Sequence, residues 1–201
     1  MRLILVRHGE TACNVRDVWH GWDDCALTER GLEQAQAIAA RLADEPIDAV
    51  YCSDAPRALQ TAQAVAGPHG IRPIPDPGLR ERNAGAFEGV ATTEVVARHP
   101  RIWEERNADY WGWSPPGGET FRQVLERVEA VLERIAAQYP DGTVVLVTHM
   151  GPVRVLISRL AGISLAGTYE LSFPSTCLSI FSIGDGAGTV ELLNDAAHLP
   201  Q

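Results

Sequence analysis

Short, uninterrupted apolar runs constrain the fold of this chain more than any other feature. Residues 3–6 (LILV) and 144–147 (VVLV) contain only apolar side chains, and residues 49–52 (AVYC) form a third run. Such runs are typical of strands that are buried on both faces of a sheet covered by helices. Apolar positions at helical spacing follow the runs, so the alternation predicts an α/β fold, a three-layer α/β/α sandwich with a largely parallel central sheet.

Two helix starts can be located from their capping signals. Thr28 is expected to cap a helix whose apolar positions run from 32 to 42. Ser53 or Asp54 is expected to cap a second helix that has Pro56 in its first turn. The second helix would then begin at the edge of the sheet where the strand at 49–52 ends.

The later part of the chain contains a second set of signals. Thr120 and Gln123 form a capping box ahead of the most regular helical pattern in the chain, at 124–135. Residues 178–183 and 189–193 flank a GDGAG sequence, which predicts a hairpin.

The organisation of the chain is predicted to be a single domain over residues 1–201. The 201 residues include no long polar or low-complexity stretch, and this length falls within the range of one domain. Residues from about 73 to 118 are rich in Pro, Gly and Trp and have the weakest periodicity. We expect an irregular covering segment there, with a short helix near 93–98.

Charge and cysteine content limit the classes of partner. The net charge of −9 without a basic run disfavours nucleic acid and membrane partners, so an anionic ligand would need arginines concentrated in a pocket. The apolar part of the N-terminal MRLILVRHGE is too short for a signal peptide or a membrane span, which predicts a cytoplasmic protein. The cysteines form no C-x-x-C pair and are expected to be reduced and free of metal: Cys13, Cys25, Cys52 and Cys177.

Two histidines follow two of the predicted strands in matching positions. His8 lies in the sequence RHG after the first strand, and His149 lies in THMG after the strand at 144–147. Ligands of such sheets bind at the carboxyl ends of the strands. Arg57 falls in the first turn of a helix at this edge, where the helix dipole disfavours a cation unless an anion is bound there. These residues together predict an anion site.

The same residues belong to motifs that occur in a characteristic order. LVRHGET, SDAPRALQTA, LRERNAGAFEG and VTHMG follow one another, with ALTERGLEQA at 26–35. From about residue 2 to residue 193 the chain resembles the histidine phosphatase superfamily, in its phosphoglycerate-mutase-like branch. The resemblance implies His8 as the nucleophile, Arg7, Arg57 and His149 as ligands of the phosphoryl oxygens, a hydrogen bond from Asn14, and Glu81 as the proton donor.

Two further residues are candidates for substrate binding. Met150 lies within VTHMG, and Trp22 is one of several tryptophans that could face the covering segment. Aromatic side chains there could line a pocket for the organic leaving group.

The chemistry of the side chains agrees with these roles. A neutral imidazole, with an ordinary pKa of about 6.5, is a nucleophile at neutral pH and a carrier of a phosphoryl group. The donor fork of arginine matches phosphate geometry and stays charged. Because phosphoryl transfer needs mainly alignment and charge compensation, no metal or other cofactor is expected. H-E-x-x-H, D-x-D-x-D-G and Walker sequences are all missing.

The preferred interpretation is a phosphomonoesterase that hydrolyses a small phosphorylated metabolite through a phosphohistidine intermediate. A phosphoglycerate mutase would use the same residues, but it must exclude water from the phosphohistidine, and the covering segment and the C-terminal tail are short here. An inactive phosphate-sensing or binding module is the third interpretation, and the intact set of site residues argues against it. The ester and the oligomeric state stay open, and a homodimer is compatible with the sequence.

Overall fold

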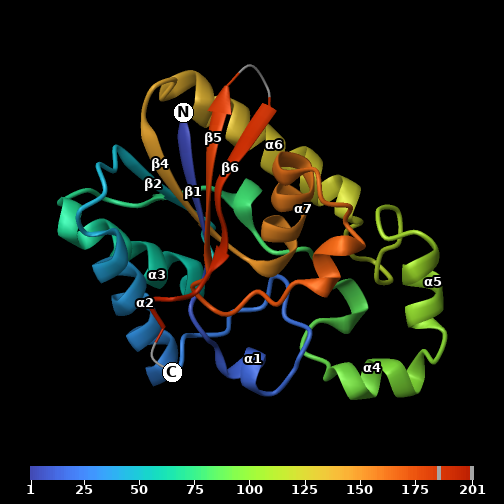
Figure 1. Ribbon diagram of the computed structural model, residues 1–201. Helices are drawn as coiled ribbons and strands as arrows, with labels where there is room; N and C mark the ends of the chain where they lie inside the picture. Colours follow the sequence, from blue (N-terminus) through green and yellow to red (C-terminus); the bar gives the residue numbers. More distant parts are fainter. Residues whose placement is uncertain (185–186, 200–201) are drawn as a thin grey trace.

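A six-stranded sheet runs through the middle of the computed structural model, which describes residues 1–184 and 187–199 (Figure 1). Its order is β3-β2-β4-β1-β5-β6, and the first four strands are parallel while β5 and β6 are antiparallel. The strands are β1 (Arg2–Arg7), β2 (Ala49–Cys52), β3 (Ile74–Pro75), β4 (Thr143–Thr148), β5 (Leu178–Gly184) and β6 (Ala187–Asp195). The predicted largely parallel sheet is confirmed.

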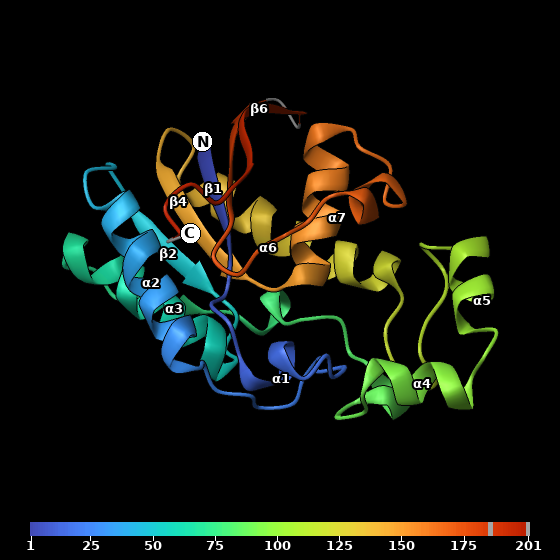
Figure 2. The ribbon, with the colours of Figure 1, turned by 60° about the horizontal axis from the view of Figure 1, so that its bottom comes forward.

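Four long helices cover the two faces of this sheet. The helices α2 (Glu29–Leu42) and α3 (Pro56–Ala66) lie on one face, and α6 (Phe121–Gln138) and α7 (Met150–Ala161) lie on the other (Figure 2). Side chains of β1 alternate accordingly, with Leu3 packed toward α6 and α7 and Ile4 toward α2 and α3. The three-layer sandwich is therefore confirmed. Among the helices of the described ranges, none is long and apolar enough to cross a membrane.

Two of the three expected helix caps are present. The Thr28 side chain accepts a hydrogen bond from the Gly31 amide, and the box of Thr120 with Gln123 is complete. The third expectation was wrong, because α3 begins after Ala55 and has no side-chain cap. The Ser53 hydroxyl accepts from the Ala55 amide, and Asp54 forms an ion pair with Arg80, so neither side chain is free to cap the helix.

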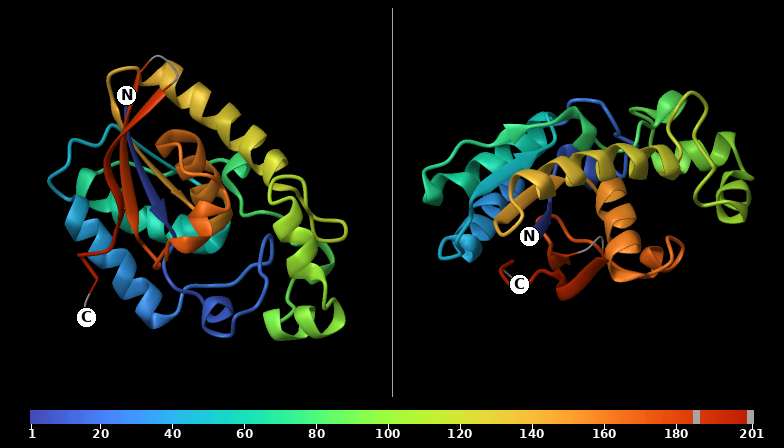
Figure 3. Two further views of the ribbon diagram at one scale, coloured as in Figure 1. Left: turned by 45° about the vertical axis from the view of Figure 1, so that its right-hand side comes forward. Right: turned by 90° about the horizontal axis from the view of Figure 1, so that it is seen from above.

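The region from 73 to 118 contains more regular structure than its composition indicated. The expected short helix is α4 (Thr92–Arg98), and a second helix, α5 (Ile102–Ala108), was not expected. Both helices stand beside the sandwich (Figure 3), where a small apolar cluster includes Trp19, Trp103 and Trp113. The remaining short elements are α1 (Ala12–Val15) and the 3₁₀ helices η1 (Gly67–His69), η2 (Pro77–Leu79), η3 (Gly85–Phe87) and η4 (Gly167–Glu170).

The hairpin at the end of the chain is present. β5 pairs with β6 in antiparallel fashion, and Gly184 lies opposite Ala187. Asp185 and Gly186, in the middle of the expected GDGAG turn, lie outside the described residues.

The expectation that all four cysteines are reduced was wrong for one pair. Cys13 and Cys25 form a disulfide, with their Cα atoms 6.3 Å apart, whereas Cys52 and Cys177 are free and buried. The loop after α1 turns back so that Cys25 also accepts a hydrogen bond from the Cys13 amide. Spacing along the sequence did not reveal this return of the chain.

Candidate active site

His8 and His149 meet at the carboxyl edge of the sheet because β1 and β4 are paired in parallel register. Arg7, the last residue of β1, lies opposite Thr148, the last residue of β4. The His8 amide then donates to the Thr148 carbonyl at 2.9 Å. The two imidazole rings have their centroids 5.0 Å apart, and both side chains are buried. The sequence prediction that both strands deliver a histidine to one place is therefore met by the geometry.

The contacts of His8 determine its tautomer. Its Nδ1 lies 2.7 Å from the Gly9 carbonyl oxygen, which can only accept, so Nδ1 carries the proton. The lone pair is consequently on Nε2. Burial first, and then the charges of Arg7 and Arg57, hold the pKa of His8 well below the usual value of an imidazole. The ring is therefore neutral at neutral pH, the state that a nucleophile requires.

Arg57 is fully buried and links His149 to the loop after α1. Its Nε donates to His149 Nδ1 at 3.2 Å, and its two terminal nitrogens donate to the carbonyls of Asp23 and Gly21 at 2.9 and 2.8 Å. Because His149 Nδ1 accepts this bond, the proton of a neutral His149 is on Nε2. Burial and the charge of Arg57 hold the pKa of His149 well below the usual value. His149 is thus a neutral donor.

Two buried donors at this edge have no hydrogen-bond partner among the described residues, namely His149 Nε2 and Arg7 Nε. One terminal nitrogen of Arg7 donates to the Phe173 carbonyl, which fixes the guanidinium beside His8. Buried polar groups are normally satisfied, so unsatisfied donors need an explanation. An oxyanion held by Arg7 and His149 supplies one.

Glu81 lies at the amino end of α7. Its carboxylate accepts hydrogen bonds from the Gly151 amide, at 2.9 and 3.2 Å, and from the Arg82 amide at 2.8 Å. A Cβ atom at position 151 would lie 2.2 Å from Glu81 Oε1. Glycine at 151 is therefore required for the carboxylate to approach the helix terminus, where a negative charge is also favoured.

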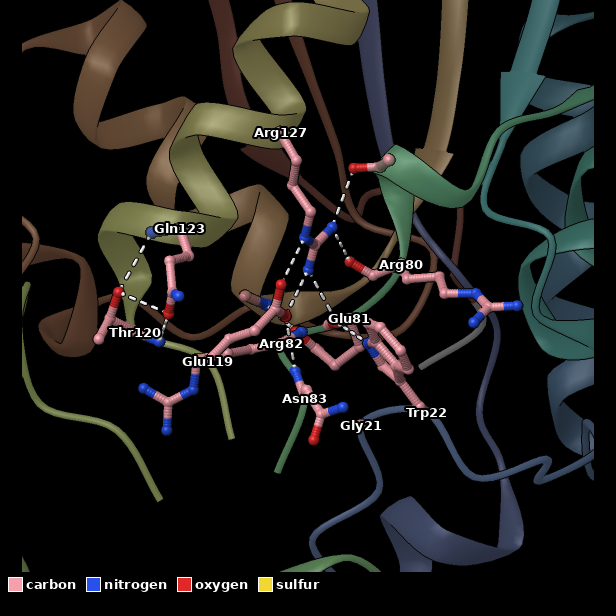
Figure 4. Close-up of polar contacts among 12 residues, drawn as sticks. Gly21, Trp22, Arg80, Glu81, Arg82, Asn83, Glu119, Thr120, Gln123 and Arg127 are labelled. Carbon is pink, nitrogen blue, oxygen red and sulfur yellow. Dashed lines mark hydrogen bonds and ion pairs between the residues drawn. The ribbon is translucent and has the colours of Figure 1, made fainter. Parts of the chain in front are cut away.

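A set of polar contacts holds the chain around Glu81 in place (Figure 4). Arg127 on α6 donates to the carbonyls of Gly78 (2.9 Å), Arg80 (2.6 Å) and Glu81 (2.9 Å) and pairs with Glu119. The Glu119 carboxylate also accepts a hydrogen bond from the Asn83 amide at 2.8 Å. Arg127 was not predicted from the sequence, because only the tertiary fold brings α6 beside this loop.

The remaining predicted residues differ in their placement. Asn14 and Met150 line a cavity of about 620 Å³ together with Arg7, His8 and Glu81. The side-chain oxygen of Asn14 accepts from the Thr11 amide, and its amide nitrogen faces His20 Nε2 at 3.5 Å.

Trp22 is not among the residues that line this cavity. It is 45% exposed, and its Nε1 donates to the Glu81 carbonyl at 2.9 Å (Figure 4). The Arg80 guanidinium lies over its ring, 5.0 Å from the centroid. Its side chain therefore contacts the segment that carries Glu81.

Other cavity residues were not identified from the sequence. They include His20, Arg82, Arg106, Arg154 and Tyr169. Arg82 directly follows Glu81, and Arg154 follows THMG by three residues, so proximity to the motifs was the available signal. Within residues 1–184 and 187–199, no three His, Cys, Asp or Glu side chains are grouped so that they could hold a metal ion.

Known proteins resemble this chain over nearly its whole length. The profile of the histidine phosphatase superfamily (branch 1) matches residues 3–196. The adenosylcobalamin/alpha-ribazole phosphatase of Salmonella typhimurium is 31% identical over 204 residues, which cover 98% of this chain and 98% of that protein. A solved mycobacterial glucosyl-3-phosphoglycerate phosphatase, in complex with VO3, has a TM-score of 0.86 and 29% identity over 97% of this chain and 99% of that chain.

Some relatives are longer than this chain. A bifunctional protein of Mycobacterium tuberculosis is 34% identical over 200 residues, which cover 98% of this chain and 55% of that protein. The chain thus spans about half the length of the mycobacterial relatives that it matches.

Proposed function

The chain belongs to the histidine phosphatase superfamily, and on this premise we propose that it is a phosphomonoesterase that hydrolyses a small phosphorylated metabolite through a phosphohistidine at His8. The observation that carries the proposal is the neutral His8, with its Nε2 lone pair free, beside the unpartnered donors of Arg7 and His149. The similarity to a Salmonella phosphatase over 98% of both chains supports hydrolysis.

In the first step, the Nε2 lone pair of His8 attacks phosphorus and the bond to the leaving oxygen breaks. Arg7 and His149 donate hydrogen bonds to the equatorial oxygens. Three of the five N–H groups of Arg57 bond to the protein, and its remaining N–H groups donate to the same oxygens. Glu81, in its protonated form, gives its proton to the leaving oxygen. The products of this step are the free alcohol, phosphohistidine and the Glu81 carboxylate.

In the second step, water attacks the phosphoryl group on His8. Glu81 takes a proton from this water, so the P–N bond breaks, phosphate leaves and the starting states of His8 and Glu81 are restored. The positive charge that compensates the phosphoryl oxygens comes from Arg7 and Arg57, so we propose that no metal ion takes part.

A trapping experiment tests the mechanism. After incubation with phosphoryl-labelled p-nitrophenyl phosphate and a rapid alkaline quench, we expect the label on His8. His8→Asn should not be labelled, whereas His20→Asn, which removes the ring 6.4 Å away, should be. Label on another residue would refute the proposal, as would its absence from a single turnover. Transfer to an organic acceptor faster than to water would identify a mutase instead.

A further inference from the structure

Three arginines that the proposed mechanism does not use line the same cavity as His8. Arg82 follows Glu81, Arg106 lies on α5, and Arg154 lies on α7. They come from three separate parts of the chain, so the fold gathers them in one place. The net charge of the protein is −9, so this cavity wall differs in sign from the protein as a whole.

Aromatic rings hold these guanidinium groups in position. Arg106 and Arg154 lie over the ring of Tyr169, with the guanidinium carbons 4.8 and 4.1 Å from its centroid. Arg82 lies over Phe121 at 4.3 Å. Such contacts favour and orient a cation, but they do not neutralise its charge.

No carboxylate among the described residues forms an ion pair with any of the three. Nearby arginines differ, since Arg80 and Arg127 pair with carboxylates at 2.6 and 3.0 Å. Burial lowers the pKa of Arg82 and of Arg154, and the charge of Arg106 lowers both further. Tyr169 and Glu81 act in the opposite direction and raise both pKa values. The charge of Arg106 is therefore close enough to act on both of the other guanidinium groups.

Two donors of this group are also left without a partner. Arg82 Nη1 and Arg106 Nε are buried, and neither has a hydrogen-bond acceptor in the described structure. Arg154 donates to the carbonyl of Thr168, which orients it. Unbalanced charge and unsatisfied donors in one cavity wall both call for an anion.

We propose that Arg82, Arg106 and Arg154 form a second anion subsite, which binds a carboxylate or phosphate group on the organic part of the substrate. The inference rests on the proposed function in placing the reacting phosphoryl group at His8. The charge of Arg7 also lowers the pKa of Arg154, so the two anion sites are within electrostatic reach. A cavity of about 620 Å³ accommodates a small metabolite that bridges them.

Binding of non-hydrolysable phosphonates tests the subsite without requiring turnover. Calorimetry would compare 3-phosphonopropionate with its neutral amide and with propane-1,3-diphosphonate. We expect the carboxylate or the diphosphonate to bind about 10- to 100-fold more tightly than the amide, as hydrogen bonds to charged groups do. Whichever of these two compounds binds more tightly shows whether the second anion is a carboxylate or a phosphate group. Equal affinity for all three compounds would overturn the proposal.

Matched variants assign the preference to these residues. Arg106→Met and, independently, Arg154→Met keep an apolar stem against Tyr169 and remove the charge. Each should abolish most of the preference for the acid and change the affinity for the amide less than about twofold. The control Arg101→Met removes a charge from an exposed position beside α5 and should change neither affinity. An equal effect of Arg101→Met, or an unchanged preference in both test variants, would refute the assignment.

The two proposals fail in different ways. If His8 is phosphorylated but the acids show no preference, the subsite is wrong and the phosphatase mechanism stands. If the acids are preferred but no phosphohistidine forms, the subsite stands and the mechanism is wrong.

Discussion

Hydrogen-bond direction determines what each histidine can do at this site. The Gly9 carbonyl fixes the proton of His8 on Nδ1, whereas Arg57 fixes that of His149 on Nε2. One neutral ring therefore presents a lone pair and the other presents a donor, only 5.0 Å away. In the proposed mechanism, the same residue type thus supplies both an electron pair for attack and a hydrogen bond for the phosphoryl oxygens.

Replacement of Glu81 by Gln should affect substrates according to their leaving groups. A general acid is needed most when the departing oxygen is strongly basic, so an alkyl ester should lose about 10²- to 10⁴-fold in the rate of His8 phosphorylation. An aryl ester such as p-nitrophenyl phosphate should lose much less. Rapid-quench measurement of the first turnover gives the rate of His8 phosphorylation for each of the two esters.

The control for this prediction is Glu10→Gln, which changes another carboxylate of the cavity, bound to the Thr28 hydroxyl. It should leave the ratio between the two esters unchanged. Equal losses for both esters in Glu81→Gln would exclude Glu81 as the acid. Glu88 or Glu119 would then be the next candidate.

The residues of the site could be predicted from the sequence where a strand or motif delivers them. His8, His149 and Arg57 follow directly from the position of strand ends in a parallel sheet. Arg106 and Tyr169 could not be found in this way, because they reach the cavity from α5 and η4 through tertiary packing. A motif of residues that are close in the sequence does not predict contacts between segments that are far apart in the sequence.

At the scale of elements, α6 positions the loop that carries Glu81. Arg127→Met should remove the donors to three carbonyls of this loop and allow Glu81 to move. Since Arg127 touches no substrate in the proposed mechanism, it acts as a positioning residue. We expect the alkyl ester to lose more activity than the aryl ester, as in Glu81→Gln but to a smaller extent, while KM changes little.

The comparison for this variant is Arg134→Met, on the same helix, where the arginine is exposed and pairs with Asp76. It should leave the ratio of the two esters unchanged, and Arg127→Lys should recover part of the loss. A uniform decrease for both esters in Arg127→Met would indicate a general loss of structure rather than misplacement of Glu81.

The disulfide joins α1 to the loop whose Gly21 and Asp23 carbonyls bind Arg57. Reduction should lower the free energy of unfolding by about 2–4 kcal/mol, because a closed loop restricts the unfolded chain. Urea denaturation with and without dithiothreitol measures the change. The Cys13→Ala/Cys25→Ala double variant should be less stable by a similar amount and insensitive to the reductant. A wild-type transition unaffected by reduction would contradict this expectation.

The elements themselves were largely predictable, and the exceptions have local causes. The buried runs at β1 and β4 and the box of Thr120 with Gln123 specify their elements directly. Helix α5 was missed because its residues, IWEERNA, bury only Ile102 fully and have no side-chain cap. Its position depends on the packing of its own Ile102 and Trp103 with Trp19 in a cluster from several segments.

At the scale of the whole molecule, the balance of charge is uneven. The chain carries −9 overall, yet Arg7 and Arg57 are buried at the carboxyl edge of the sheet and three further arginines line the cavity. A local positive field in a cavity attracts anions even when the net charge opposes them. The fold therefore concentrates positive charge where the proposed substrate binds.

Stability should depend on pH because the site buries neutral histidines. Burial and arginine charges lower the pKa values of His8 and His149 in the folded protein, while those of the unfolded chain stay at about 6.5. Below that pH the unfolded state binds more protons, so the free energy of unfolding should fall as the pH decreases, by up to about 1.4 kcal/mol per pH unit for each histidine. Urea denaturation from pH 8 to pH 5, without phosphate, measures this slope. His8→Asn should reduce the slope by the amount that corresponds to the uptake of roughly one proton on unfolding. His99→Gln, at an exposed position, should leave the slope unchanged. Coincident fluorescence and circular dichroism transitions would also support one cooperative domain over residues 1–201. A slope that is unchanged in His8→Asn would mean that His8 is not held neutral by the fold.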